Sequence, residues 1–167
     1  PLDPRRTPVH APHLTTAEIK RVANSGATVA ICPTTEANLG DGLFPLRAYL
    51  EAGGAWGIGS DSHISVSPVE ELRWLEYGQR LNTRHRNIAV SPDSSSVGET
   101  LLRGVQASAS RSTGQQAVAD YVVLDTDAPV FAGMRPHDVV DRWVFSGNRN
   151  AVREVHVGGQ RVVAEGR

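Results

Sequence analysis

The sequence predicts an α/β fold in roughly its first two thirds and a smaller β-rich part after it. Three stretches repeat one pattern, in which a short apolar strand is followed by a polar loop and a capped helix. After Gly114, short β-rich runs separated by turn residues replace this pattern. Alternating strands and helices are typical of a parallel sheet covered by helices. We therefore divide the chain into an α/β part, residues 1–115, and a β part, residues 116–167.

The first unit begins with a strand at residues 9–13 and continues into a helix from Thr15. Thr15 and Glu18 have the spacing of a capping box, in which the threonine hydroxyl accepts a first-turn N–H and the glutamate reaches back. Apolar residues follow at helical spacing. Ser25-Gly26 ends the helix, because glycine tolerates the left-handed conformation at a helix C-terminus.

The second unit contains the longest apolar run of the chain, residues 27–32. A continuous apolar run of this length suits a strand covered on both faces, as in a parallel sheet. Pro33 ends the strand, and we expect a loop over residues 34–42, which are rich in Thr, Asn, Gly and Asp. A helix is expected at residues 45–52.

The third strand, residues 55–59, runs into Ser60-Asp61-Ser62-His63. Pro68 then opens a helix that is expected to reach Asn82, since a proline at the first helical position loses no hydrogen bond. The spacing of Ser96 and Glu99 is that of a second capping box and predicts a helix through Val105.

The β part is predicted from short runs rich in β-branched and aromatic residues. These runs are residues 121–124, 143–145, 152–157 and 161–163. Gly158-Gly159 lies between the last two runs, and a glycine pair in this position indicates a β-hairpin.

Composition excludes several classes of function. The 167 residues have a formal net charge of −1, which argues against nucleic acid or an anionic membrane surface as a partner. Cys32 is the single cysteine, so an internal disulfide framework is excluded. No apolar run approaches the roughly 18 residues of a membrane span. No secretory signal is evident, and we expect a cytoplasmic setting.

Few residues have the pattern of a chemical site. His10 and His13 end the first strand, where at most one of them points into a shared site because strand side chains alternate. Asp61 follows a buried strand, as a metal-binding carboxylate in an α/β barrel does, although a turn residue fits the local sequence better. The polar loop at residues 32–42 could line a pocket or be an ordinary connection. Glu70, Glu71 and Glu76 are interpreted as a solvated helix face.

Taken together, these pieces resemble the amidohydrolase superfamily. The resemblance rests on residues 9–15, on the run from Cys32 to Gly42 and on Gly59-Ser60-Asp61-Ser62-His63. Residues 69–80, Val-Glu-Glu-Leu-Arg-Trp-Leu-Glu-Tyr-Gly-Gln-Arg, are similar to the formimidoylglutamate deiminases within it. The resemblance implies a distorted (β/α)₈ barrel with an appended β-sandwich, of which this chain supplies barrel strands six to eight and C-terminal sandwich strands.

The resemblance also implies a reaction. In it, a divalent metal, zinc or iron, activates water to convert N-formimino-L-glutamate, a small-molecule substrate, to N-formyl-L-glutamate and ammonia. Asp61 matches the aspartate that binds the metal and moves protons, and His10 matches the histidine that polarises the substrate or stabilises the intermediate. No role is implied for His13 or His63, and the substrate-binding residues are unknown.

The sequence departs from the family pattern at several points. The His-x-His pair of strand one and the histidine of strand five are missing, and one aspartate cannot hold a catalytic zinc, which takes three protein ligands. We therefore expect the 167 residues alone to be inactive. Arg5-Arg6-Thr7-Pro8 precedes His10 where a barrel strand should be apolar, so this strand is expected to be imperfect. Three strands of eight also leave the sheet open, which predicts marginal stability and association, for example as a homodimer.

Two alternatives stay open. The first is another amidohydrolase, such as a guanine deaminase or a chlorohydrolase-like aminohydrolase. The second is a non-catalytic remnant or an interaction module that binds no metal.

Overall fold

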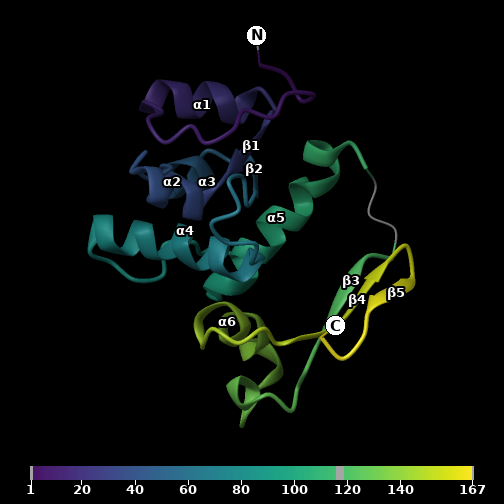
Figure 1. The fold of residues 1–167 in the computed structure, drawn as a ribbon. Coiled ribbons are helices and arrows are strands. Elements are labelled where there is room, and N and C mark those ends of the chain that lie inside the picture. Colours follow the sequence, from purple (N-terminus) through teal and green to yellow (C-terminus); the bar gives the residue numbers. More distant parts are fainter. Residues whose placement is uncertain (1, 116–118, 167) are drawn as a thin grey trace.

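The computed structural model describes residues 2–115 and 119–166. Its N-terminal part contains the strands β1, Thr28–Ile31, and β2, Ala55–Ile58, which pair in parallel with Thr28 opposite Ala55 (Figure 1). Val29 and Ile31, on one face of β1, have no solvent exposure, and Thr28, on the other face, is 1% exposed. The prediction of a parallel strand covered on both faces is confirmed.

The strand predicted at residues 9–13 is reduced to a single parallel bridge between Val9 and Ala30. The His10 N–H donates to the Ala30 carbonyl at 2.8 Å, and the Ala30 N–H donates to the Pro8 carbonyl at 2.9 Å. His10 and Ala11 then take φ values of +69° and +55°, which break the extended conformation. The expected imperfection of this strand is therefore observed, and a full strand at residues 9–13 is wrong.

The helix α1, Thr16–Asn24, begins as predicted. The Glu18 N–H donates to the Thr15 hydroxyl at 3.3 Å, and the Thr15 N–H donates to the Glu18 carboxylate at 2.9 Å. Both halves of the capping box are thus present.

The helix α2, Pro33–Leu39, replaces most of the loop that the sequence predicts at residues 34–42. Pro33 ends the preceding strand and at the same time occupies the first turn of the helix, where its missing N–H costs nothing. Gly40, with φ +73°, ends the helix in the left-handed conformation. The polar composition of this segment therefore belongs to a short helix whose first residues are buried.

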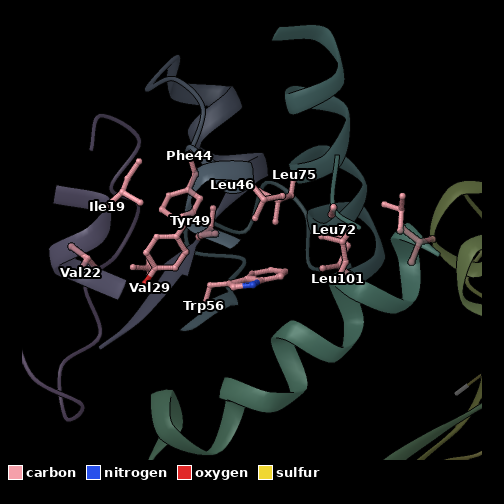
Figure 2. Close-up of a cluster of buried hydrophobic side chains, with 14 residues drawn as sticks. Ile19, Val22, Val29, Phe44, Leu46, Tyr49, Trp56, Leu72, Leu75 and Leu101 are labelled. Carbon is pink, nitrogen blue, oxygen red and sulfur yellow. The ribbon is translucent and has the colours of Figure 1, made fainter. Parts of the chain in front are cut away.

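The remaining helices of this part are α3, Leu46–Glu51, α4, Pro68–Thr83, and α5, Val97–Thr113. All three lie where the sequence predicts helices, but α5 continues beyond the predicted end at Val105 to Thr113. Their apolar faces close one core around Trp56, Tyr49 and Leu101 (Figure 2). The second capping box is half formed, because the Ser96 hydroxyl accepts the Glu99 N–H whereas the Glu99 carboxylate binds Ser94 and Arg103.

The prediction that Glu71 and Glu76 of α4 lie on a solvated face is wrong. The two residues are 2% and 0% exposed. The Glu76 carboxylate accepts hydrogen bonds from Arg80 Nε at 2.7 Å and from the N–H groups of Ile88 and Ala89 at 2.9 and 3.0 Å. Glu76 therefore fixes the segment that follows α4 by satisfying its backbone donors.

The C-terminal part contains an antiparallel sheet of β3, Tyr121–Leu124, β4, Val152–Val157, and β5, Gln160–Val163 (Figure 1). β4 and β5 form the predicted hairpin, and its turn residues Gly158 and Gly159 have φ values of +57° and +77°. The sequence predicts that the α/β part ends at residue 115 and that the β part begins at residue 116. This boundary lies next to residues 116–118, which are outside the described residues.

The run at residues 143–145, predicted as a strand, belongs instead to the helix α6, Val139–Phe145. α6 follows two 3₁₀ turns, η1, Pro129–Phe131, and η2, Pro136–Asp138, and packs against α4 and α5. Val144 is fully buried there, and the Asp141 carboxylate accepts the Gly98 N–H at 2.7 Å. Helical spacing, rather than strand alternation, is what allows this segment to bury Val144 against other helices.

Arg73 ties α4 to the residues that end and follow α6. Its guanidinium donates to the carbonyls of Val144 and Gly147 at 2.7 and 2.6 Å and to Asn148 Oδ1 at 2.7 Å. We refer to this set of contacts as the Arg73 clamp.

Among the helices of residues 2–115 and 119–166, none is both long and apolar enough to cross a membrane.

Candidate functional site

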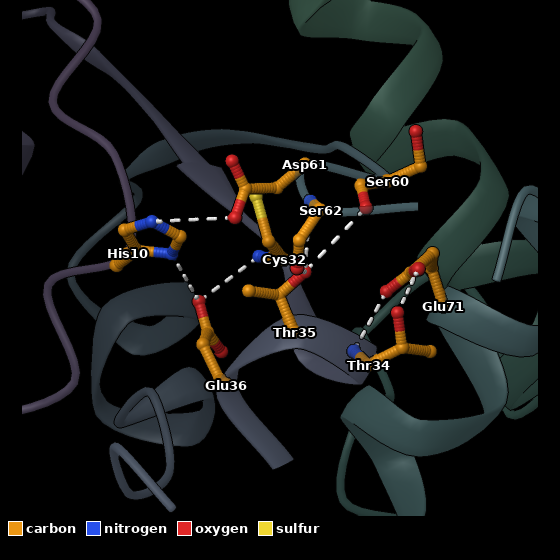
Figure 3. A network of polar contacts seen from close by, with 9 residues as sticks. All are labelled: His10, Cys32, Thr34, Thr35, Glu36, Ser60, Asp61, Ser62 and Glu71. Atoms are coloured by element: carbon orange, nitrogen blue, oxygen red, sulfur yellow. Dashed lines mark hydrogen bonds and ion pairs between the residues drawn. The ribbon is translucent and has the colours of Figure 1, made fainter. Parts of the chain in front are cut away.

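The candidate site lies where the Val9 bridge, β1 and β2 end. These three segments run parallel, so their carboxyl ends lie at the same edge of the sheet. His10 follows the bridge, Cys32 follows β1, and the Gly59-Ser60-Asp61 segment follows β2. Figure 3 shows their side chains gathered at this edge. In α/β barrels this is the edge that carries the active site.

The structure brings His10 and Asp61 together. His10 Nε2 lies 4.0 Å from Asp61 Oδ2, and the two side chains are 32% and 44% exposed, so both can be reached by a small molecule. Asp61 has a φ of +39° within a turn that is closed by a hydrogen bond from His63 N–H to the Ser60 carbonyl. Both residues therefore occupy the left-handed region, which non-glycine residues seldom adopt and which concentrates at functional sites.

Glu36 of α2 is a third member of this cluster. Its side chain is 4% exposed, and its Oε1 accepts the Cys32 N–H at 2.9 Å and lies 3.3 Å from His10 Nδ1 (Figure 3). Burial raises the pKa of Glu36, while the Cys32 N–H and His10 lower it. No motif in the sequence assigns a role to Glu36. A signal was present, since a carboxylate in the first turn after Pro33 can reach back to a free backbone N–H.

Thr35 connects α2 to the Asp61 turn. Its hydroxyl lies 2.9 Å from the Ser62 hydroxyl and accepts the Ser62 N–H at 3.3 Å. The turn that carries Asp61 is thereby fastened to the helix that carries Glu36.

Thr34 and Glu71 form a second buried contact at the start of α2. The Glu71 carboxylate accepts the Thr34 N–H at 2.9 Å and the Thr34 hydroxyl at 2.5 Å. Burial is the largest cause that raises the pKa of Glu71, and the two hydrogen bonds from Thr34 oppose it. This contact joins α2 to α4 and serves the packing of the helices.

The raised pKa of Glu71 predicts a pH-dependent stability difference. The folded state favours the protonated carboxyl, so the free energy of unfolding falls as pH rises from the unfolded pKa through the folded one. Glu71→Gln cannot titrate. We therefore expect this variant to gain stability relative to the parent chain as pH rises from about 4 to about 7, in urea unfolding. A stability difference that does not vary with pH would contradict this assignment.

Cys32 lies beside the cluster but is not suited to act as a nucleophile. Burial, with smaller contributions from the Glu36 and Asp61 carboxylates, raises the pKa of its thiol to about 11. The thiolate is the reactive form, so it is scarce near neutral pH.

We expect iodoacetamide at about pH 8 to label Cys32 only as fast as the chain unfolds. Labelling followed by mass spectrometry, with and without urea, measures this difference. Folded-state labelling at the rate of a free thiol would show that the side chain is accessible.

The other two histidines of the sequence motifs lie apart from this contact. His13 lies beside the loop glycine Gly42, whose added Cβ would be 3.2 Å from the imidazole. His63 is exposed and has a φ of +55°.

The residues present fit one part of a metal site. Across residues 2–115 and 119–166, no group of three or more His, Cys, Asp and Glu side chains could hold a metal ion. The Asp61 carboxylate is partly exposed, and within the same residues no side chain or backbone group donates a hydrogen bond to it. An uncommitted carboxylate next to an imidazole is suitable as a metal ligand, and further ligands would have to come from outside the described residues.

The sequence of this chain is similar to that of a known deiminase. No family model matches the sequence. The chain is 46% identical over 173 aligned residues to the formimidoylglutamate deiminase of Pseudomonas aeruginosa, and the alignment covers 99% of the chain and 38% of that protein. The chain therefore spans less than half the length of this relative.

Two solved structures have folds that are similar to the fold of this chain. The crystal structure of an amidohydrolase from Brucella melitensis matches 99% of this chain and 38% of its own, with a TM-score of 0.91 and 38% identity. An adenosine deaminase from Xanthomonas campestris with bound zinc matches at a TM-score of 0.83 and 22% identity, covering 99% of this chain and 38% of its own, which shows the fold alone.

Proposed function

We propose that this chain, which has the sequence and fold of a C-terminal portion of an amidohydrolase, forms part of a metal-dependent formimidoylglutamate deiminase. The observation that carries the proposal is the 46% identity to such an enzyme over 99% of the chain. The reaction adds water to N-formimino-L-glutamate and gives N-formyl-L-glutamate and ammonia, as part of histidine degradation in the cytoplasm.

The fold assignment follows the same comparison. We propose that the Val9 bridge, β1 and β2 correspond to barrel strands six, seven and eight. The sheet of β3, β4 and β5 then belongs to a small β-sandwich. On this assignment residues 1–115 are the barrel part and residues 116–167 the sandwich part, with α6 returning to pack on the barrel helices.

Asp61 is proposed as a metal ligand and as the group that moves protons. A divalent metal, zinc or iron, would be held by Asp61 and by groups outside the described residues. When bound, it supplies a Lewis acid that makes water acidic enough to ionise near neutral pH. The Asp61 carboxylate takes the proton from the water that attacks the formimino carbon. It then delivers that proton to the formimino nitrogen. The hydrogen left on the added oxygen moves to the same nitrogen as the carbon–nitrogen bond breaks and the formyl C=O forms, because ammonia leaves far more readily than an amide anion.

His10 is proposed to stabilise the reacting group. Its exposed Nε2 faces the space next to Asp61, at 4.0 Å from Oδ2. A hydrogen bond between this nitrogen and the substrate, accepted by its lone pair in the neutral ring or donated by the protonated ring, would favour the tetrahedral intermediate over the planar formimino group. The proposal leaves the groups that bind the substrate carboxylates unassigned.

Ammonia release from N-formimino-L-glutamate tests the proposal. A longer polypeptide that contains this chain should release ammonia, lose activity after chelation and regain it with Zn²⁺ or Fe²⁺. Release from guanine or dechlorination of a triazine instead would favour another amidohydrolase. No activity and no stoichiometric metal would favour a non-catalytic remnant. The 167 residues alone are expected to be inactive, and sedimentation would test whether they form a homodimer.

A further inference from the structure

We propose that Glu36 is a positioning residue that holds the hydrogen of the His10 imidazole on Nδ1, so that Nε2 is the nitrogen presented to Asp61. The consequence for catalysis rests on the function proposed above, whereas the state of the ring does not.

The His10 ring lies between two carboxylates on different elements (Figure 3). Its Nδ1 is 3.3 Å from Glu36 Oε1, and its Nε2 is 4.0 Å from Asp61 Oδ2. A neutral imidazole carries one hydrogen, and the partner of one nitrogen decides the role of the other. The nearer carboxylate, Glu36, is therefore the one that selects the tautomer.

The geometry at Glu36 fixes the direction of this hydrogen bond. Oε1 already accepts the Cys32 N–H at 2.9 Å, so this oxygen acts as an acceptor. The ionised carboxylate has no hydrogen to donate, so a hydrogen bond between the same oxygen and Nδ1 has Nδ1 as its donor. Nε2 is left with its lone pair in the neutral ring, or with a second N–H in the protonated ring, and in both states it faces Asp61.

Burial and a hydrogen bond from the backbone fix the position of the Glu36 side chain. Its side chain is 4% exposed and is held at the first turn of α2 by the Cys32 N–H. The His10 backbone is fixed from the other side by its hydrogen bond to the Ala30 carbonyl at 2.8 Å, with φ at +69°. Two independent anchors thus hold the ring and its partner, as is usual for a positioned catalytic histidine.

Glu71 provides a matched control. It is a buried glutamate, 2% exposed, whose carboxylate also contacts the first turn of α2. Its partner is Thr34 rather than an imidazole. Glu36→Gln and Glu71→Gln therefore make the same chemical change at similar burial, and only the first touches His10.

The tautomer is measured directly by long-range ¹H–¹⁵N spectra of the ¹⁵N-labelled 167-residue chain at about pH 8, with the His10 signals identified from a His10→Gln variant. We expect a protonated-type shift at Nδ1 in the parent chain and in Glu71→Gln. Glu36→Ala, which removes the acceptor, is expected to move the hydrogen to Nε2, and Glu36→Gln to do so in part. A hydrogen on Nε2 in the parent, or on Nδ1 in a folded Glu36→Ala, overturns the proposal. If Glu36→Ala does not fold, the parent spectrum and Glu36→Gln decide.

The activity of the longer polypeptide provides a second test of the role of Glu36. We expect Glu36→Gln to lower kcat by about 10- to 100-fold with little change in KM and with an altered pH profile. Glu71→Gln should leave kcat and its pH profile unchanged. Equal losses in the two variants would indicate a packing effect and overturn the positioning role. Absence of deiminase activity in the parent would defeat the proposed function but leave the tautomer result standing.

Discussion

Replacement of Asp61 by asparagine in the longer polypeptide is expected to lower kcat/KM for formimidoylglutamate by about 10²- to 10⁴-fold, the range for loss of a proton-transferring group. Asparagine keeps the size of the side chain but cannot accept the proton and is a poorer metal ligand. The backbone should be unaffected, because asparagine, like aspartate, tolerates the positive φ found here, +39°. Ammonia release measures the effect.

Asp93→Asn is the matched control for this experiment. Asp93 is exposed in the turn between Ser91 and Ser94 and is not a member of the cluster, so its replacement should leave the activity unchanged. The metal content of each variant distinguishes the two proposed roles of Asp61. A variant that loses the metal has lost a ligand, whereas an inactive variant that keeps the metal has lost the group that moves protons. Retention of more than a tenth of the parent activity in Asp61→Asn would remove Asp61 from the proposed mechanism.

Glu76→Ala is expected to destabilise the chain by about 3–5 kcal/mol, the range for breaking a buried charge pair from one side. The carboxylate is fully buried and accepts from Arg80 Nε and from the N–H groups of Ile88 and Ala89. Alanine leaves these donors without a partner and leaves a cavity at the turn after α4. Urea unfolding followed by far-UV circular dichroism measures the loss.

Glu51→Ala is the control for Glu76→Ala. Glu51 pairs with Arg47 at 3.0 Å on the surface, where the side chains are 65% and 64% exposed, so its removal should have a much smaller effect. Similar urea midpoints for the two variants would mean that Glu76 is not an anchor of the fold.

The elements that could be predicted from the sequence are those whose signal is local. The Thr15 capping box has its partner three residues further on, and the apolar run at residues 27–32 indicates a buried strand by its composition alone. α2 is not predicted from the sequence because its Thr and Asn composition is typical of a loop, and α6 is not predicted because Trp143-Val144-Phe145 also suits a strand. Contacts with α4 and α5, which are distant in sequence, decide the conformation of α6.

The same distinction applies to the site. His10 and Asp61 follow the first and the third of three parallel segments whose carboxyl ends share one edge, so their presence at the same edge could be anticipated from strand order. The contact of Glu36 with His10 spans 26 residues and depends on α2 being a helix. The burial of Glu71 and Glu76 depends on donors from other segments, and a glutamate whose donors are not adjacent in sequence is read as solvated.

The Arg73 clamp has a consequence for synthesis on the ribosome. The groups that its guanidinium contacts lie 71–75 residues further along the chain. At about 5–20 residues per second, α4 emerges about 4–15 s before its partners do. During this interval the Arg73 guanidinium lacks these three partners, and the helix faces that they will cover are open to chaperones. Docking of the last segment is therefore a late step in the biogenesis of this chain.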